Sequence, residues 1–178
     1  MQVEPEARLG AKVASEPDRS VRRDVALTCA HCLGANPFIY HPADHASQFP
    51  VKVVAEDKHR DLAILEVPSA LKSVVPLSLY KGNAPPNGSD ISLLGYPNHF
   101  AATPLRVEGG KLIRTFSKSA VSYLEISPKI IGGNSGGPVL NDKYQVIGVA
   151  VLGISGSTKL TSAEFFAVNG TELTALLK

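Results

Sequence analysis

Turn-forming residues recur at short intervals along almost the whole chain, and this spacing limits the folds available to it. Proline, glycine, asparagine and short charged clusters interrupt the apolar segments about every eight to twelve residues. Segments of that length predict many short strands, and therefore an all-β sandwich or barrel. The segments expected to be strands are 10–14, 25–28, 38–41, 51–55, 62–67, 77–79, 90–95, 106–115, 122–126, 137–140, 145–151 and 164–168.

The last ten residues, 169–178, depart from this pattern. Leu173, Leu176 and Leu177 follow the i, i+3, i+4 spacing that places side chains on one face of a helix. We therefore expect a short C-terminal helix. It has no stop signal before the last residue, so we expect the sequence to be one domain of a longer parent chain.

Three stretches contain the residue types that a nucleophilic hydrolase needs. TCAHC at 28–32 contains His31, DLAIL at 61–65 begins with Asp61, and GNSGGP at 133–138 contains Ser135. A serine hydroxyl needs a base to take its proton, and a histidine suits that role because its pKa lies near neutrality. A buried carboxylate fixes the imidazole tautomer and stabilises the imidazolium as it forms.

The local context of each residue favours this chemistry. The glycines around Ser135 let a substrate carbonyl approach and let backbone N–H groups converge on an oxyanion, although a plain flexible turn would look similar. His31 follows an apolar strand segment. Asp61 leads directly into one, whereas its competitors Glu56 and Asp57 do not.

The three motifs, in this order, resemble those of the trypsin-like (chymotrypsin-clan) serine protease family over residues 24–170. The resemblance implies an all-β fold of two six-stranded antiparallel β-barrels with the site in the cleft between them. It also implies that the N–H groups of Gly133 and Ser135 form the oxyanion hole. We expect an N-terminal barrel over 1–80 with His31 and Asp61. An exposed linker over 81–89, rich in proline and glycine, precedes a C-terminal barrel over 90–178 with Ser135.

The same resemblance places the substrate pocket. Lys129, six residues before Ser135, corresponds to the base of the primary pocket, where trypsin has an aspartate, so basic specificity is not supported. Either Lys129 favours acidic side chains, or it points to solvent and leaves an apolar pocket lined by Ile130 and Ile131. The pocket wall, expected to pair with the substrate backbone, consists of Ala150, Val151 and Leu152.

The sequence also departs from the secreted members of the family. Asn134 stands where zymogen-activated members have an aspartate, and the chain has no Ile-Val-Gly-Gly start, so proteolytic activation is not expected. These features, and the stretch FFAV at 165–168, resemble the HtrA/DegP-type and related intracellular or viral branches. The usual strand before the histidine is not visible, which leaves an incomplete first barrel as an alternative.

The only two cysteines, Cys29 and Cys32, flank His31. In secreted relatives a cysteine directly after the histidine pairs with a distant one. This chain has no such partner, so a reducing, cytoplasmic location is expected. The Cys-x-x-Cys spacing also suits redox chemistry or half of a zinc site, but no second Cys/His pair has ligand spacing. We predict two ordinary buried thiols, no metal and no cofactor. His41 and His45 are interpreted as solvated loop histidines beside Pro42.

Charge and hydropathy exclude other classes of partner. The net charge is only +2 and the basic residues are scattered, so no nucleic-acid surface is expected. The longest apolar run, 146–154, is too short to cross a bilayer, so no membrane contact is expected. The first twenty residues hold four acidic residues and do not read as a signal peptide. A protein or peptide substrate remains.

The sequence thus predicts a serine endopeptidase that hydrolyses peptide bonds through an acyl-enzyme and works as a regulated intracellular protease. Two alternatives stay open. One is a catalytically silent domain of the same fold that binds peptides or a protein partner. The other is a viral protease that processes its own polyprotein.

Overall fold

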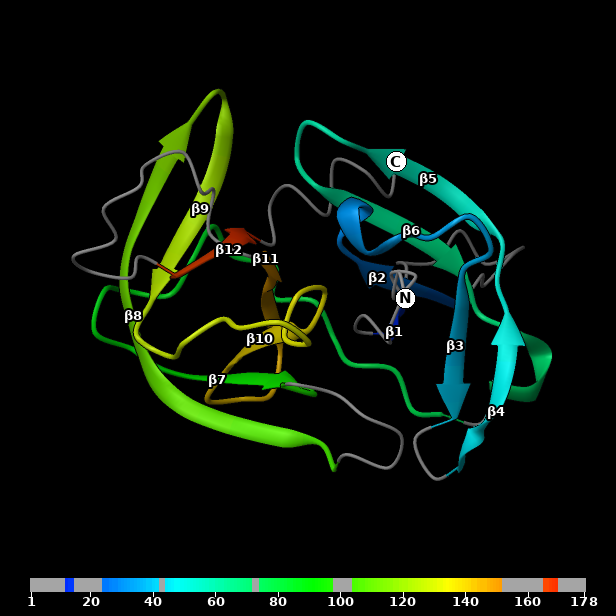
Figure 1. Ribbon diagram of the computed structural model, residues 1–178. Coiled ribbons are helices and arrows are strands. Elements are labelled where there is room, and N and C mark those ends of the chain that lie inside the picture. The colour runs from blue at the N-terminus through cyan, green and yellow to red at the C-terminus, as the bar shows by residue number, and fades with distance from the viewer. Residues whose placement is uncertain are drawn as a thin grey trace.

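The computed structural model describes residues 12–14, 24–41, 44–71, 74–97, 104–151 and 165–169. Within these residues the regular secondary structure is almost entirely β-strand, as predicted (Figure 1). The first half contains β1 (Lys12–Ala14), β2 (Asp24–Thr28), β3 (Phe38–His41), β4 (Asp44–Pro50), β5 (Val53–Asp57) and β6 (Leu62–Glu66), with 3₁₀ turns η1 (Ala30–Cys32) and η2 (Ser69–Leu71). The second half contains β7 (Asp90–Gly95), β8 (Arg106–Lys118), β9 (Val121–Ile126), β10 (Pro138–Asn141), β11 (Val146–Val151) and β12 (Phe165–Asn169).

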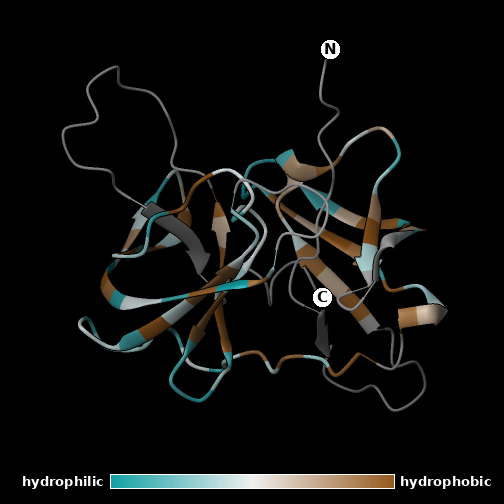
Figure 2. Ribbon diagram, turned by 60° about the horizontal axis from the view of Figure 1, so that its bottom comes forward, coloured by the Kyte–Doolittle hydropathy of each residue, from teal (hydrophilic) through white to brown (hydrophobic). Residues whose placement is uncertain are grey.

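The strands of the second half close into an antiparallel barrel in the order β10-β11-β12-β9-β8-β7. Alternation along β7 turns Ile91 and Leu93 inward, because successive side chains of a strand point to opposite faces. They pack with Leu112, Leu124 and other apolar residues in the barrel interior. Figure 2 shows the hydrophobic residues concentrated on the strands and the hydrophilic ones in the turns.

The strands of the first half form two sheets. One has four strands in the order β1-β2-β6-β5, and the other is the β3–β4 hairpin. The central strand β6 buries four successive residues, 62–65, as expected for a continuous apolar run covered on both faces. The described strands of this half do not close into a ring.

A third hydrophobic cluster joins the two halves. Leu27 of β2 and Ile64 of β6 pack in one cluster with Val149 and Val151 of β11. All of these side chains are buried. Since burial of apolar surface is the main favourable term in folding, this shared cluster fixes the two halves against each other.

The hairpin β3–β4 corrects one sequence prediction. His41 and His45 were assigned to a loop, but His41 ends β3 and His45 lies in β4. Residues such as Asp44 and Pro50 are poor strand formers. Pairing with β3, which buries Ile39 in the core of the first half, overrides that weak local preference.

Three other predicted elements have different outcomes: one is shorter in the structure, one lies mostly outside the described residues, and one is shifted along the chain. The strand expected at 77–79 is reduced to isolated bridge positions at Leu77 and Leu79, of which Leu79 pairs in parallel with Val146. Asn169 belongs to β12, and the remaining residues of the expected C-terminal helix, 170–178, lie outside the described residues. The strand expected at 51–55 begins at Val53 and ends at Asp57. In the part of the chain that is described, no helix has the length and apolar character needed to span a membrane.

Candidate active site

His31 and Asp61 lie in two neighbouring turns of the first half. His31 belongs to η1, directly after β2, and Asp61 precedes β6. Because β2 and β6 pair with Thr28 opposite Ala63, the residue just beyond one strand meets the residue just before the other. Asp61 has a φ of 55°, in the left-handed region that a short polar side chain tolerates better than most.

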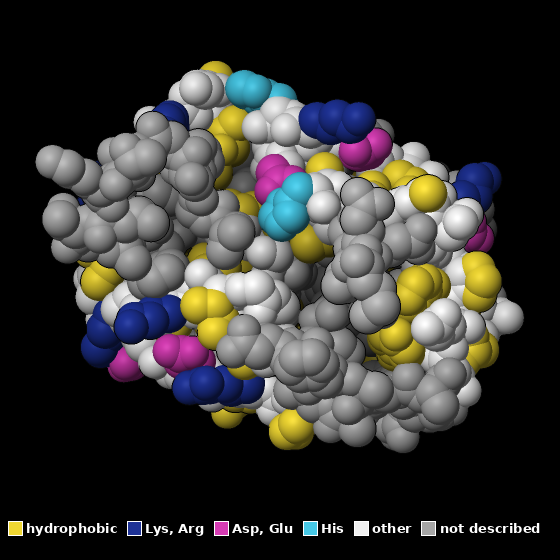
Figure 3. Space-filling view, in the orientation of Figure 1, with side chains coloured by type: hydrophobic (Ala, Val, Ile, Leu, Met, Phe, Trp, Pro, Cys, Tyr) yellow, Lys and Arg dark blue, Asp and Glu magenta, His cyan; other side chains and the backbone are white. Residues whose placement is uncertain are grey.

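The Asp61 carboxylate holds His31 at two points. Its Oδ1 accepts a hydrogen bond from the backbone N–H of His31 at 2.9 Å, and its Oδ2 lies 2.6 Å from the ring Nδ1. Since an ionised carboxylate can only accept, Nδ1 carries the proton and Nε2 remains available for chemistry. Figure 3 shows a histidine beside an acidic side chain, both open to solvent, near the middle of this face of the molecule.

This contact changes the charge preference of the imidazole. The hydrogen bond with Asp61 is the largest cause that raises the pKa of His31 from 6.5 to about 10, and a hydrogen bond with Cys32 adds to it. Partial burial of the ring acts in the opposite direction. The site therefore strongly stabilises an imidazolium, the charge state that a histidine base acquires when it takes a proton.

Ser135 lies in a tight turn whose backbone shape requires glycine. Gly133 has a φ of 95° and Gly136 a φ of 81°. A side-chain carbon at Gly133 would overlap the carbonyl oxygen of Tyr96, and one at Gly136 would overlap the hydroxyl of Thr28. No other residue type fits these two positions without strain.

Two backbone N–H groups in this turn are left without a partner. Among the described residues, neither Gly133 nor Ser135 donates its N–H to a hydrogen bond, whereas the neighbouring N–H of Gly136 donates to Ala150 at 2.8 Å. The carbonyl of Gly133 accepts from the N–H of Tyr96 at 3.1 Å, which fixes the orientation of the peptide between Gly133 and Asn134. Two N–H groups that both lack an acceptor, beside a serine, are suited to stabilise an oxyanion.

The turn that carries Ser135 packs against the end of β2. Gly136 sits against Thr28 and the backbone of Cys29, two residues before His31. The thiol of Cys29 donates a hydrogen bond to the carbonyl oxygen of Ala150 at 3.0 Å, across the boundary between the halves. The structure thus brings His31 to Asp61 and seats the Ser135 turn beside them. Within the described residues no hydrogen bond joins Ser135 to His31, a separation common in unliganded sites.

The residues expected to line the substrate pocket take different positions. The Lys129 side chain is exposed and Ile131 is half-buried, whereas Ile130 is buried in the core of the second barrel. Ala150 and Val151 are buried in β11. Leu152 lies outside the described residues. Of the two alternatives for Lys129, this position favours the one in which it points to solvent.

The two cysteines are not equivalent. Cys29 is fully buried, and burial is the main cause that raises the pKa of its thiol. Cys32 is only partly buried, and its side-chain contact with Cys29, aided by one with His31, lowers its pKa to about 5. The prediction of a buried thiol therefore holds for Cys29 alone. Neither thiol forms a disulfide, and both sulfur atoms lie close to the His31 ring.

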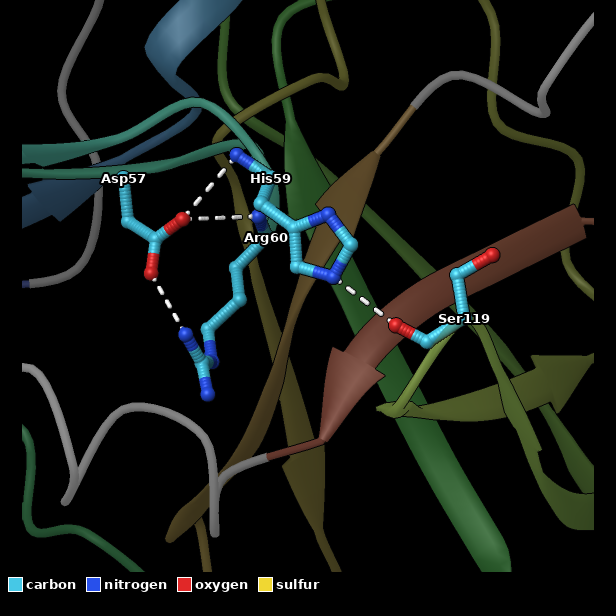
Figure 4. A network of polar contacts seen from close by, with 4 residues as sticks. All are labelled: Asp57, His59, Arg60 and Ser119. Carbon is cyan, nitrogen blue, oxygen red and sulfur yellow. Dashed lines mark hydrogen bonds and ion pairs between the residues drawn. The ribbon is translucent and has the colours of Figure 1, made fainter.

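The turn that precedes Asp61 in the chain contains a polar network that the sequence did not indicate. Asp57 accepts hydrogen bonds from the N–H groups of His59 and Arg60, each at 3.0 Å, and pairs with the Arg60 guanidinium at 2.6 Å (Figure 4). His59 Nε2 in turn lies 2.8 Å from the carbonyl oxygen of Ser119, at the tip of the β8–β9 hairpin. Asp57 thus shapes the turn before Asp61 rather than competing with Asp61 for His31, and His59 ties that turn to the second barrel.

A hollow of about 370 Å³ lies elsewhere, between the inter-barrel segment and the β10–β11 turn. Its lining includes Tyr80, Pro86, Asp90, Asn141 and Lys143. None of the predicted site residues contributes to it, so it is separate from the candidate active site.

Comparison with protein families gives one match, to the trypsin-like peptidase domain, over residues 14–149. Comparison with the curated proteins gives no sequence match. The matched residues include His31, Asp61 and Ser135, together with the network around Asp57.

Solved structures of similar fold come from bacterial proteases. The active form of the Rv3671c protease from M. tuberculosis aligns with a TM-score of 0.71 and 23% identity, over 86% of this chain and 67% of that one. A serine endoprotease from Yersinia pestis aligns with a TM-score of 0.68 and 20% identity, over 85% of this chain and 51% of that one. The HtrA-type protease AlgW, solved with a decapeptide, aligns with a TM-score of 0.70 and 19% identity, over 86% of this chain and 48% of that one.

Proposed function

The chain belongs to the family of trypsin-like peptidase domains, and we propose that His31, Asp61 and Ser135 form its catalytic triad. Membership of this family makes the protein a serine endopeptidase that acts on protein or peptide substrates. The observation that carries the triad is the two-point contact between Asp61 and His31, through the backbone N–H at 2.9 Å and the ring Nδ1 at 2.6 Å. This contact selects the tautomer that a histidine base needs.

In this proposal each residue has one task in peptide-bond hydrolysis. Ser135 Oγ attacks the scissile carbonyl while Nε2 of His31 takes its proton, and the N–H groups of Gly133 and Ser135 stabilise the oxyanion. The imidazolium then protonates the leaving amine, which gives an acyl-enzyme. Water, activated by the same Nε2, attacks the acyl group and restores Ser135. Asp61 stays ionised throughout and offsets the charge on His31.

We further propose an apolar primary pocket. The exposed position of Lys129 and the half-buried position of Ile131 support it, because an ammonium group in solvent does not line a pocket. Buried Ala150 and Val151 of β11 supply the strand beside which an extended peptide would lie. A library of peptides that differ only at the residue before the cleaved bond tests this. Preference for acidic residues there would contradict it.

The proposed setting is a reducing, cytoplasmic one in which the protease serves a regulated role. The free thiols of Cys29 and Cys32, in a chain without further cysteines, support the reducing environment. Solved relatives are longer than this chain, which spans 67% and 51% of two of them, and a regulated role would involve further domains. A full-length protein that degrades casein broadly without a trigger would contradict the regulated role.

Covalent labelling by a fluorophosphonate probe tests the triad. We expect labelling of the wild type and none of the Ser135→Ala or His31→Ala variants, because the probe reports a serine activated by its base. Ser78→Ala, which alters an exposed serine far along the chain from the site, is the matched control and should label like the wild type. A folded wild type that does not label would favour the alternative, a catalytically silent domain that binds peptides or a protein partner.

A further inference from the structure

Three possible metal ligands lie together in the turn that follows β2. One atom from each of Cys29, His31 and Cys32 falls within 4.8 Å of the other two. A tetrahedral Zn²⁺ site, with bonds of about 2.3 Å to sulfur and 2.0–2.1 Å to nitrogen, spaces its ligand atoms by roughly 3.5–4 Å. The spacing is therefore close to that of a zinc site, and the ligand atoms need to approach one another by no more than about 0.8–1.3 Å to bind an ion.

The backbone holds these ligands in place. The N–H of Cys32 donates to the carbonyl oxygen of Cys29 at 3.2 Å, and the N–H of Leu33 donates to that of Ala30 at 3.0 Å. These bonds define η1, so the two thiols and the imidazole are presented by one short 3₁₀ turn. The sequence alone does not show that the three residues converge, because their proximity depends on the conformation of η1.

The neighbours of the cluster also suit a metal ion. Metal-binding histidines usually give their second ring nitrogen to a carboxylate, which fixes the ring. Asp61 occupies Nδ1 of His31 in this way at 2.6 Å and leaves Nε2. Loss of the thiol proton of Cys29 would not leave the carbonyl of Ala150 without a partner, because that oxygen also accepts the N–H of Gly136 at 2.8 Å.

We propose that Cys29, His31 and Cys32 form a binding site for one thiophilic divalent cation, with Zn²⁺ the best fit and a water in the fourth position. Binding requires two thiolates and a neutral imidazole whose Nε2 carries no proton. Whatever protons these three groups hold in the unbound protein therefore pass to solvent, and the two thiolates balance the charge of the ion. Sulfur and imidazole ligands select zinc-like ions over Mg²⁺ and Ca²⁺, which prefer oxygen.

The site has a consequence for catalysis, which rests on the proposed function. Nε2 of His31 is the atom that takes the proton of Ser135 in the triad, and it is also the nitrogen left for the metal. One lone pair cannot serve both. Occupancy of the cluster therefore switches the peptidase off, and release of the ion restores it.

The experiment uses the folded, fully reduced protein and Co²⁺ as a spectroscopic substitute for Zn²⁺. We expect one equivalent of Co²⁺ to produce a thiolate-to-cobalt charge-transfer band and the visible bands of a tetrahedral ion, both displaced by Zn²⁺. Cys32→Ser and Cys29→Ala each remove one of the two thiolate ligands. Each variant should therefore lack the charge-transfer intensity expected for two thiolates and bind Zn²⁺ more than about a hundredfold more weakly. His59→Ala, which removes a histidine outside the cluster, is the matched control and should bind like the wild type.

Each outcome decides the proposal. Absence of charge transfer in the wild type, or equal Zn²⁺ binding by the wild type and both cysteine variants, would overturn the site. Labelling by the fluorophosphonate probe, compared with and without Zn²⁺ for each protein, tests the consequence. Zn²⁺ should suppress labelling of the wild type and not of Cys32→Ser. Suppression in both, or in neither, would overturn the switch. A protein that never labels bears on the triad, while the Co²⁺ spectrum still decides the site.

Discussion

The turn that carries Ser135 and the turn that carries Asp61 hold their residues by different means. The serine turn is fixed by backbone contacts, since Gly133 and Gly136 leave no space between their backbone and the neighbouring chain. The aspartate turn is fixed by side-chain hydrogen bonds. Asp57 accepts from the backbone N–H groups that follow it, and the His59 ring contacts the carbonyl oxygen of Ser119. One turn depends on the absence of side chains and the other on the presence of particular ones.

This difference determines how each turn should respond to substitution. A glycine whose missing side chain makes room for a carbonyl oxygen cannot be replaced without movement of the backbone. An exposed hydrogen bond can be lost for about 0.5–1.5 kcal/mol, because water replaces the partner. Substitutions in the serine turn should therefore cause large losses of activity, and substitutions in the Asp57–His59 network small ones. Asp61 is an exception within its turn because of its proposed catalytic role.

The largest effect is expected from Asp61→Asn. The amide keeps the shape of the side chain but allows the wrong imidazole tautomer, and in a comparable Ser-His-Asp protease this change lowers kcat by about 10⁴-fold. We expect a fall of that order, measured as kcat on a peptide substrate. Asp142→Asn, in the exposed β10–β11 turn, is the matched control and should leave kcat unchanged. A loss below tenfold for Asp61→Asn would place the catalytic carboxylate elsewhere.

The next effect is expected from Gly133→Ala. The added carbon overlaps the carbonyl oxygen of Tyr96 at a backbone φ of 95°, so the peptide must turn and its N–H leaves the proposed oxyanion hole. Loss of one oxyanion donor lowers kcat by about 10²–10³-fold. Gly132→Ala is the matched control, because a side-chain carbon there meets nothing within 4 Å. Equal kcat values for the two variants would show that the hole does not use Gly133.

The sequence was most informative where chemistry restricts residue type. The glycines around Ser135 predicted a turn with free N–H groups, and the apolar run after Asp61 predicted its place at a strand entrance beside His31. The regular spacing of short strands predicted an all-β sandwich or barrel, and the resemblance to trypsin-like proteases implied the closed barrel that the second half forms. In each case the structure accepts only a narrow choice, either of residue type, as for the glycines, or of spacing between turns, as for the short strands.

The sequence was least informative where long-range contacts decide. Nothing local distinguishes β4, with Asp44 and Pro50, from a loop, since only its pairing with β3 makes it a strand. The contact of His59 with Ser119 joins residues sixty positions apart, and the grouping of both cysteines with His31 depends on the conformation of η1. The apolar segment at 77–79 looks like a strand, but it passes β11 with a single bridge.

A smaller effect, on stability, is expected from Asp57→Asn. Hydrogen bonds from the backbone and side chain of Arg60 hold the pKa of Asp57 below its usual value of 3.8. Its contribution to stability is therefore present above the unfolded pKa and lost as the pH falls through the folded one. We expect the variant to be less stable by about 1 kcal/mol at neutral pH and to lose less stability than the wild type below about pH 4. Denaturant unfolding across this pH range measures both; parallel pH profiles would contradict the assignment.

The smallest effect is expected from His59→Ala, which breaks the contact between the Asp61 turn and the β8–β9 hairpin. The bond is exposed and the shared core of Leu27, Ile64 and Val149 still holds the two halves together. We expect a loss of about 0.5–1 kcal/mol in unfolding free energy and a fall of kcat by no more than about fivefold. Lys58→Ala, in the same turn, is the matched control, because its ion-pair partner Glu56 lies 3.8 Å away and the lysine side chain is 84% exposed. A loss of kcat near that of Gly133→Ala would mean that this one bond sets the register between the halves, and that the aspartate turn is as intolerant as the serine turn.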